Sequence, residues 1–323
     1  MSRLFVDDRY RGTHGIGRYA REVVARLRAE AEPLALDGTP YSPVDAFRAL
    51  PVVGARDVVY SPGYGALVRA PKQIITVHDL IQLRSPWPAR AKFIAYYAGP
   101  VRRVVRKAGV VLTVSETSAR DIRAWVRDDR VRVVNAGNGC SDAFLPDGPT
   151  RTTDASYLMY VGNTRHHKNL AVVLNALNHT PDLRLRAVIP TPEVPAAAAL
   201  AMSAGVSDRV EWISGIDDDQ LAALYRGAAA TVMPSIDEGF GLPALESVAC
   251  GVPVIYWRGC ESVAEIVGDR GWSLDDAHDA RAWAETFTLA ASTRRRVALP
   301  SGLYDWNRTA SIVSDELERA LES

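Results

Sequence analysis

The sequence predicts an α/β protein built from two doubly wound domains, and three observations carry this prediction. Short apolar runs rich in β-branched residues alternate with segments of helical periodicity along the whole chain. Most of these runs are apolar throughout, which is typical of strands buried on both faces of a parallel sheet. The length of 323 residues exceeds the ~250–300 residues at which one hydrophobic core usually stops growing.

The first half of the chain is expected to contain six strands separated by helices. The predicted strands are 3–7, 33–37, 57–61, 73–79, 110–115 and 130–135. An apolar stripe at helical spacing runs from Ile16 to Leu27, directly after the first strand. Strand–helix alternation of this kind favours a parallel sheet covered by helices.

The second half repeats the alternation. Its predicted strands are 157–162, 183–190, 209–214, 230–235 and 252–257. A Pro-, Asp-, Gly- and Thr-rich segment, "LPDGPTRTTDAS" at 145–156, is the one convincing linker. The sequence therefore predicts domains at 1–148 and 149–303, followed by a last segment at 304–323.

Composition excludes several classes of protein. Lys plus Arg equals Asp plus Glu at 38 each, so no excess of basic charge indicates a nucleic-acid partner. Cys140, Cys250 and Cys260 lack the spacing of a metal site, and we expect reduced, buried thiols. The N-terminus has no signal-peptide pattern, and no apolar run approaches the ~18–20 residues that span a bilayer. A cytoplasmic location is the expectation.

The most informative stretch is "PSIDEGFGLPALESVACGVPVI", residues 234–255. It predicts a strand end, a glycine-bearing loop, and a helix with Pro243 near its first position. Gly251 is expected to end that helix. The prediction places Glu238 in the loop and Glu246 on the first turn of the helix.

This arrangement suits a nucleotide sugar. Gly239 and Gly241 let a ligand approach the backbone closely, and free N–H groups at a helix start bind phosphate or sugar oxygens. The two carboxylates can accept hydrogen bonds from hydroxyls on either side of a phosphate. The alternative is an ordinary helix start, where Glu246 only complements the helix dipole.

The stretch resembles the signature of retaining glycosyltransferase family 4, enzymes of the GT-B fold, whose E-x7-E pair matches Glu238 and Glu246. The resemblance covers most of the chain. It includes "GIGRYAREVV", "TVHDLIQL", "VLTVSETSARDI", "YVGNTRHHKNL" and "YDWNRTASIV". It implies two Rossmann-like domains facing a central cleft, an acceptor-side first domain, a nucleotide-sugar-binding second domain, and a final helix at 304–323 that returns to the first domain.

The resemblance also implies roles for individual residues in the second domain. Glu238 would hold hydroxyls of the donor sugar, and Glu246 the ribose. Lys168 would neutralise the diphosphate. The backbone N–H groups that would meet the sugar and the diphosphate belong to Gly239, Phe240, Gly241 and Leu242.

The chain departs from the family pattern just before the lysine, where it reads "RHHK". Family members commonly carry an arginine near this position. The second cationic role would fall to Arg165 or, weakly, to His167. A neutral His167 would leave the diphosphate clamp one charge short.

Two candidates lie in the first domain. Gly15 and Gly17 in "HGIG" follow the first strand and would lie against the donor phosphates or the acceptor; the alternative is a tight turn. His78 ends the run "QIITVHD" and matches the family's histidine close to the reacting sugar, whereas a lone histidine is more often structural. Asp79 would orient that imidazole or contact the acceptor.

The implied chemistry retains the anomeric configuration. The departing phosphate would take the acceptor's proton while Lys168 and the helix N-terminus stabilise it and His78 steadies the oxocarbenium-like sugar. We expect no metal ion and no cofactor besides the nucleotide-sugar substrate. The acidic run 217–219 is interpreted as a helix N-cap rather than a metal motif.

A basic segment at 88–110 carries the aromatic residues Phe93, Tyr96 and Tyr97 and would suit an anionic membrane surface. We favour the other interpretation, a partly buried helix interrupted at Pro100 with a solvated basic face.

The leading hypothesis is a metal-independent, retaining hexosyltransferase of polysaccharide or glycoconjugate biosynthesis. Its partners would be a nucleotide-sugar donor, with GDP-mannose the leading candidate, and a glycan, glycolipid or natural-product acceptor. It would work in the cytoplasm or peripherally at the inner membrane face. The alternatives are a nucleotide-sugar epimerase of related fold and a catalytically weak sugar-nucleotide-binding protein.

Overall fold

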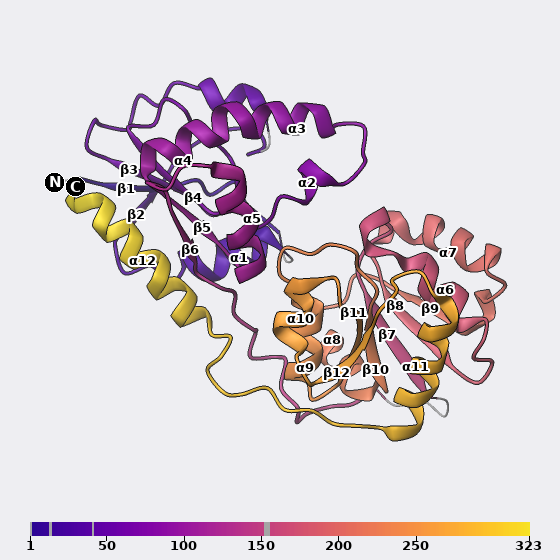
Figure 1. Cartoon of the computed structure of the whole chain (residues 1–323). Helices are drawn as coiled ribbons and strands as arrows, with labels where there is room; N and C mark the ends of the chain where they lie inside the picture. Colours follow the sequence, from indigo (N-terminus) through magenta and orange to yellow (C-terminus); the bar gives the residue numbers. More distant parts are fainter. Residues whose placement is uncertain (1, 13–14, 41, 152–155) are drawn as a thin grey trace. The chain divides into compact units, whose positions relative to one another are not determined.

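The computed structural model describes residues 2–12, 15–40, 42–151 and 156–323 (Figure 1). His14 of the "HGIG" loop and residues 152–155 of the predicted linker therefore lie outside the described residues. The chain divides into two compact units. Unit 1 comprises Met1–Gly139 with Tyr304–Ser323, and unit 2 comprises Cys140–Leu303.

Unit 1 is built on parallel strands. They are β1 (Leu4–Val6), β2 (Ala31–Pro33), β3 (Val58–Ser61), β4 (Lys72–Ile75), β5 (Val110–Thr113) and β6 (Arg132–Asn135). The first four form a sheet in the order β2-β1-β3-β4, and β5 pairs with β6. A parallel bridge between Thr76 and Leu112 joins the two sets just beyond β4. The strand order therefore reverses between β1 and β3.

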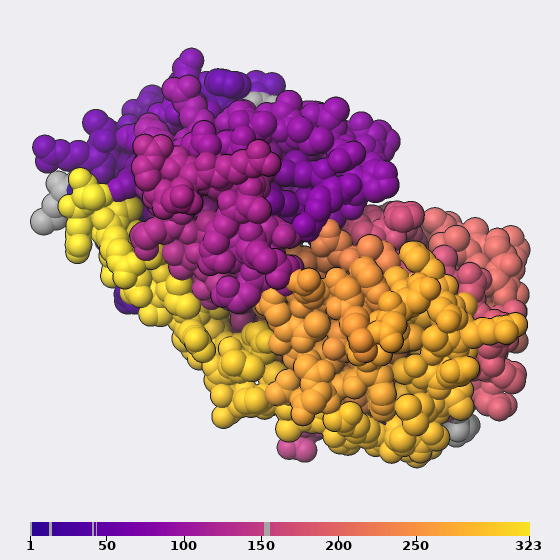
Figure 2. All heavy atoms as spheres, in the orientation of Figure 1, coloured from indigo at the N-terminus to yellow at the C-terminus, as the bar shows by residue number. Residues whose placement is uncertain are grey.

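Helices cover this sheet. They are α1 (Ile16–Val24), α2 (Ile81–Arg84), α3 (Arg90–Tyr96), α4 (Arg102–Ala108), α5 (Glu116–Val126) and α12 (Trp306–Glu322), with a 3-10 turn η1 (Pro43–Phe47) and a π-turn η2 (Tyr97–Val101). The C-terminal α12 packs on α1 and lies along the surface of unit 1, yellow in Figures 1 and 2. Arg28, just after α1, pairs with Asp315 and Glu318 of α12.

Unit 2 contains one six-stranded parallel sheet in the order β12-β11-β10-β7-β8-β9. Its strands are β7 (Tyr157–Val161), β8 (Arg184–Val188), β9 (Val210–Ile213), β10 (Ala230–Met233), β11 (Val254–Trp257) and β12 (Gly271–Leu274). Counted along the chain, this is the 3-2-1-4-5-6 order of dinucleotide-binding folds, which reverses between the first and fourth strands. Here these strands are β7 and β10.

Both faces of this sheet are covered. The helices are α6 (Leu170–Leu177), α7 (Val194–Ser203), α8 (Asp218–Gly227), α9 (Leu242–Ala249), α10 (Glu261–Val267) and α11 (Ala280–Thr293), with short turns η3 (His166–Lys168), η4 (Thr191–Glu193) and η5 (Ser207–Arg209). Along β7, Leu158 and Tyr160 belong to one buried cluster, whereas Tyr157 and Met159 belong to another. Because successive side chains point to opposite faces, this explains why the strand is apolar throughout.

Two strand predictions need correction. The predicted strand 33–37 is β2 at Ala31–Pro33, because the apolar Leu34 and Leu36 pack into a small core cluster beyond the strand end. The prediction omitted β12 altogether. Its first residue, Gly271, reads as a strand breaker, but a Cβ there would collide with the Val254 carbonyl of β11, so the pairing requires glycine.

The division between the units lies ahead of the predicted linker. Phe144 packs in a buried cluster with Tyr225 of unit 2. The Arg226 guanidinium donates to the carbonyls of Leu145 at 3.1 Å and Pro149 at 2.7 Å. These contacts make the described part of 145–151 a portion of unit 2.

Candidate functional site

The loops that follow β7 and β10 form the candidate site of unit 2. In a doubly wound sheet, ligands bind at the carboxyl ends of the strands where the strand order reverses. In unit 2 that point lies between β7 and β10. Residues 162–169 follow β7 and residues 234–241 follow β10. Most of the residues predicted for donor binding lie in these two loops.

The two loops meet through an ion pair. Lys168 Nζ lies 2.6 Å from Glu238 Oε1, and the two side chains are only 14% and 11% exposed. A backbone hydrogen bond of 2.7 Å from Ile236 N to the His167 carbonyl ties the loops together beside it. Lys168, predicted to bind the diphosphate, and Glu238, predicted to bind the sugar, are therefore in direct contact.

Two serines that the sequence analysis did not single out hold Glu238 in place. Ser235 Oγ donates to the same carboxylate oxygen, Oε1, at 2.6 Å. Ser262 Oγ, on α10, donates to the Glu238 carbonyl at 2.8 Å. Ser235 stands three residues ahead of Glu238, so the motif itself offered a signal. Ser262 offered none, because its contact depends on tertiary packing.

The loop after β7 is anchored from both sides. Tyr160 OH donates to the Asn163 carbonyl at 2.9 Å. Thr164 donates twice to Glu193 Oε2 of η4, from its backbone N at 2.6 Å and from its hydroxyl at 2.8 Å. Lys168 thus extends from a loop with a defined conformation.

The positive charge near this loop comes from Lys168 and Arg165. Burial lowers the pKa of His167, and Lys168 and Arg165 lower it further, while Glu238 opposes them. His167 is therefore neutral near pH 7. Arg165 is exposed, and no ion pair of its guanidinium is found among the described residues. The charge missing from "RHHK" can thus be supplied by Arg165.

Helix α9 begins where the sequence predicts a ligand-facing turn. Gly241, the N-cap, has φ 104°, a left-handed conformation that favours glycine, and a Cβ there would lie 3.0 Å from Val263. Pro243 stands in the first turn, and Gly241 at the N-cap has no side chain with which to cap the helix start. Gly251, with φ 77°, follows the helix end, as predicted.

The position of Glu246 on α9 is a correction. The helix begins at Leu242, and its first turn contains no acidic residue, so Glu246 lies on the second turn. It is buried and accepts a 3.1 Å hydrogen bond from Tyr225 OH. Because the helix dipole acts mainly within the first turn, dipole complementation does not explain this carboxylate.

In unit 1, both candidate glycines are required by local geometry. Gly15 has φ 57° ahead of α1. A Cβ on Gly17 would lie 2.8 Å from the Gly12 nitrogen and 2.9 Å from Arg11 backbone atoms. The tight-turn interpretation is therefore sufficient for both, and their role toward a donor stays a prediction.

His78 is a neutral imidazole at neutral pH. Burial lowers its pKa to about 4, although the Pro62 carbonyl raises it slightly in opposition. Its Nε2 lies 2.9 Å from that carbonyl, which can only accept, so Nε2 carries the hydrogen and Nδ1 is an acceptor. The Tyr19 ring packs edge-on, with centroids 4.8 Å apart. The neighbouring Asp79 carboxylate accepts from Ile81 N at the start of α2.

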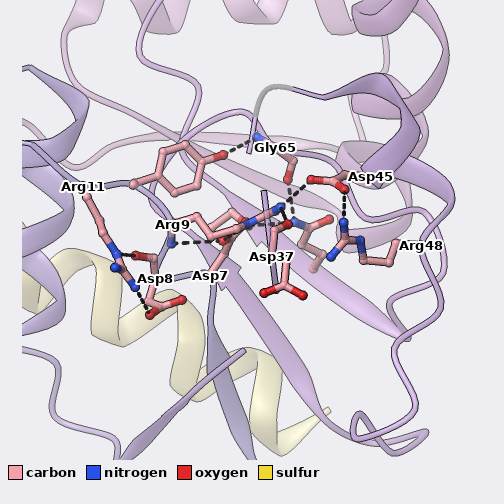
Figure 3. A network of polar contacts seen from close by, with 11 residues as sticks. Asp7, Asp8, Arg9, Arg11, Asp37, Asp45, Arg48 and Gly65 are labelled. Atoms are coloured by element: carbon pink, nitrogen blue, oxygen red, sulfur yellow. Dashed lines mark hydrogen bonds and ion pairs between the residues drawn. The ribbon is translucent and has the colours of Figure 1, made fainter. Parts of the chain in front are cut away.

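A buried polar network joins the loops at the switch point of unit 1 (Figure 3). Arg9 donates to both oxygens of Asp7 at 2.8 Å and to Asp45 of η1. Tyr10 OH accepts from Gly65 N at 2.6 Å, which connects the loop after β1 to the loop after β3. The network fixes residues 7–10, at the start of the loop after β1.

One prediction about a non-catalytic group is confirmed. Asp217 caps α8 by accepting from Gln220 N at 2.8 Å, and Asp217 N donates in return to Gln220 Oε1 at 3.2 Å. Cys250 and Cys260 are buried, as expected, whereas Cys140 is only half-buried, and burial raises the pKa of Cys250 and of Cys260 to about 12. Within the described ranges, no group of three or more His, Cys, Asp or Glu residues could hold a metal ion.

The basic segment 88–110 forms α3, the π-turn containing Pro100, and α4. Arg102 and Arg106 donate to the Trp125 and Val126 carbonyls at the end of α5, at 2.9 and 3.1 Å. These contacts complement the helix C-terminus and support the structural interpretation. No helix in the described part of the chain is long and apolar enough to cross a membrane.

A comparison with protein families covers most of unit 2. Residues 144–297 match the family described as glycosyl transferases group 1. The matched stretch is slightly less than half of the chain. It contains both loops of the candidate site, including the Lys168–Glu238 pair and α9.

Relatives and solved structures agree with this match. The chain is 26% identical over 245 residues to O-antigen chain mannosyltransferase B of Escherichia coli, covering 68% of this chain and 62% of that protein. It is 30% identical over 278 residues to a D-inositol 3-phosphate glycosyltransferase of Thermobispora bispora, covering 78% and 58%. The chain thus spans about six tenths of the length of these relatives.

The fold matches that of a solved structure over its whole length. Sucrose-phosphate synthase from Thermosynechococcus elongatus superimposes with a TM-score of 0.73 at 18% identity, covering 99% of each chain. This likeness shows an α/β fold with parallel sheets of the GT-B type. A cleft facing both sheets stays a prediction.

Proposed function

We propose that this chain is a retaining glycosyltransferase that moves a sugar from a nucleotide-activated donor to a glycan, glycolipid or natural-product acceptor. The observation that carries the proposal is the Lys168–Glu238 contact of 2.6 Å. It brings a cation and a carboxylate together at the switch point of the sheet in residues 144–297, which match the family glycosyl transferases group 1. A nucleotide sugar needs this combination, because it presents a diphosphate beside a ring of hydroxyls.

In this proposal the diphosphate binds at the start of α9, where Gly239, Phe240, Gly241 and Leu242 bring the backbone close. Lys168 and the exposed Arg165 supply the cations. Negative charge grows on the leaving diphosphate as the sugar bond breaks, so preorganised cations and N–H donors lower the barrier. Glu238 accepts hydrogen bonds from sugar hydroxyls, and Glu246 from the ribose.

The neutral state of His78 fits a role beside the reacting sugar. A cation there would repel an oxocarbenium-like transition state, whereas a neutral imidazole with pKa about 4 does not. The departing phosphate takes the acceptor's proton, which gives retention without an enzymatic nucleophile. The proposed reaction uses no metal ion or added cofactor.

GDP-mannose is the proposed donor. Similarity to a protein named as a mannosyltransferase supports it. Similarity to inositol phosphate glycosyltransferases is the reason to test other nucleotides as well. The proposed cellular location is the cytoplasm.

A thermal-shift panel of GDP, UDP, dTDP and ADP tests the donor site. A ligand at ~100 times its dissociation constant adds about 2.7 kcal/mol to the native state. We expect one nucleotide to raise the wild-type midpoint and to lose its effect on Lys168→Ala. Lys92→Ala, which changes an exposed lysine of α3, is the matched control and should respond like wild type. The absence of any shift with all four nucleotides would contradict the proposal.

Product analysis separates the alternatives. An epimerase would change the sugar of the intact nucleotide sugar without an acceptor, and a binding protein of low activity would bind a nucleotide without releasing sugar. Only the transferase delivers the sugar to an acceptor, so a glycosylated acceptor together with a free nucleoside diphosphate identifies it.

Peripheral contact at the inner membrane face belongs to the same proposal. The segment that carries α3 and α4 exposes two large apolar residues, Trp87 and Ile94, and two basic residues, Lys92 and Arg103. Co-sedimentation with phosphatidylglycerol vesicles should exceed that with phosphatidylcholine vesicles, and Lys92→Glu with Arg103→Glu should abolish the difference. If the wild type and the double variant sediment equally with both kinds of vesicle, the membrane contact is refuted and the segment has a structural role alone.

A further inference from the structure

Glu238 Oε1 accepts two short hydrogen bonds, and their donors differ in kind. One comes from Lys168 Nζ and the other from Ser235 Oγ, each at 2.6 Å. Ser235 is 2% exposed and stands just beyond β10. Its hydroxyl sits on a short side chain with one rotatable bond before the oxygen.

Lys168 is a less constant partner. Its ammonium is a compact charge on a flexible four-carbon stem, extending from the loop after β7. In the proposed function the same ammonium also attracts the diphosphate. Its contact with Glu238 must therefore change when a donor binds, whereas the Ser235 contact stays within one short segment, 235–238.

The backbone of Glu238 is fixed independently. Ser262 on α10 holds the Glu238 carbonyl at 2.8 Å, and the Ile236 N–H is bonded to the His167 carbonyl. The remaining freedom of Glu238 is its side-chain torsion angles. Hydrogen bonds to the carboxylate restrict these angles at its end.

We infer that Ser235 is a positioning residue: its hydroxyl aligns the Glu238 carboxylate for the donor sugar when Lys168 moves toward the diphosphate. The inference rests on the proposed function and deepens it. Ser235 acts through Glu238 and makes no required contact with the donor. Its loss should therefore affect recognition of the sugar and spare recognition of the nucleoside diphosphate.

The test compares a nucleoside diphosphate with its sugar conjugate by titration calorimetry. The probes are GDP with GDP-mannose, and UDP with UDP-glucose. The ratio of the two dissociation constants isolates the contribution of the sugar. Ser235→Ala should reduce this contribution about tenfold, which is 1.4 kcal/mol, and should leave affinity for the free diphosphate within about twofold.

Two variants control for damage to the fold. Ser235→Thr keeps a hydroxyl and should restore most of the sugar contribution. Ser247→Ala removes another buried hydroxyl of unit 2, which bonds only to Thr231 and to the Val252 carbonyl among the described contacts. It should leave the ratio unchanged, even where it lowers the melting temperature.

A double-mutant cycle with Glu238→Ala distinguishes positioning from direct contact. If Ser235 acts through Glu238, adding Ser235→Ala to Glu238→Ala should cost nothing further in sugar affinity. A second tenfold loss in the double variant would overturn the inference, because it would show direct contact with the donor. The cycle remains decisive if Ser235→Thr does not fold.

The remaining outcomes separate the inference from the function on which it rests. A wild-type chain that binds neither probe pair overturns the inference, and the proposed function falls with it if dTDP and ADP also fail to stabilise the chain. A wild-type chain whose sugar contribution survives intact in Ser235→Ala overturns the inference alone. A diphosphate affinity that falls together with the sugar contribution would show general damage to the site and would also overturn it.

Discussion

At the residue scale, the two glutamates should behave differently because their surroundings differ. Glu238 contacts Lys168 and Ser235 near the site surface, whereas Glu246 is buried and bonded to Tyr225. Glu238→Ala should lower turnover by about 100-fold, which is more than it lowers donor affinity. It should also free Lys168, so that GDP alone binds at least as tightly to the variant as to the wild type. Glu246→Ala should weaken GDP binding itself. Steady-state kinetics and calorimetry would measure both, and equal losses of both kinds in both variants would refute the assignment.

His78 makes stability depend on pH in a defined window. Burial lowers its pKa from 6.5 to about 4, so between these values the unfolded chain binds more protons than the folded one. Stability should therefore fall as pH drops from about 6.5 toward 4. Between pH 7 and pH 5 the free energy of unfolding should fall by about 1–2 kcal/mol less in His78→Gln, which can still donate to the Pro62 carbonyl, than in the wild type. Urea unfolding at the two pH values measures it, and identical pH dependence in both proteins would contradict the neutral-imidazole state.

The sequence identified the charged residues of the site but not the hydroxyls that support them. Lys168 and Glu238 carry formal charges at strand ends, which is a pattern visible along the chain. Ser262 and Tyr225 come from α10 and α8, so their contacts exist only once those helices pack. The turn that carries Glu246 was misplaced because Pro243 indicates a helix start only to within a residue or two.

At the element scale, the buried network of Figure 3 should stabilise the loop between β1 and α1. The Arg9 side chain is 4% exposed and pairs with the buried Asp7 and Asp45. Arg9→Ala would leave the buried Asp7 carboxylate without its cation, whereas Asp45 keeps Arg48, and breaking such a buried pair costs about 3–5 kcal/mol. Arg130, 89% exposed beside Asp128, is the matched control and should change stability by less than about 0.5 kcal/mol. Denaturant unfolding of both variants measures this, and equal effects would mean the network contributes no more than a surface pair.

Strands were predictable where apolar runs are unbroken and much less so where glycine interrupts them. β7 and β10 are buried on both faces and appear in the sequence as continuous apolar runs. β12 begins with Gly271, whose absent side chain admits the Val254 carbonyl. Short-range patterns do not show that kind of contact, because the partner strand is distant in sequence.

At the scale of the whole molecule, the proposed donor contacts concentrate in unit 2. The Lys168–Glu238 pair, α9 and the supporting serines all lie within residues 144–297, which match the family glycosyl transferases group 1. Unit 1 contributes Gly15, Gly17 and His78, whose roles toward substrates remain predictions. Two compact units also mean that unfolding need not be a single cooperative transition, so variant stabilities should be compared within one unit.

We propose that this chain cleaves a nucleotide sugar and delivers the sugar with retained configuration. Proton NMR of wild-type protein with GDP-mannose, recorded before the released sugar can mutarotate, tests this proposal, with Lys168→Ala as the inactive control. We expect GDP to be released and the mannose, free or attached to an acceptor, to appear first as the α-anomer, the configuration it has in the donor. First appearance of the β-anomer, or an epimerised sugar still attached to its nucleotide, would contradict it.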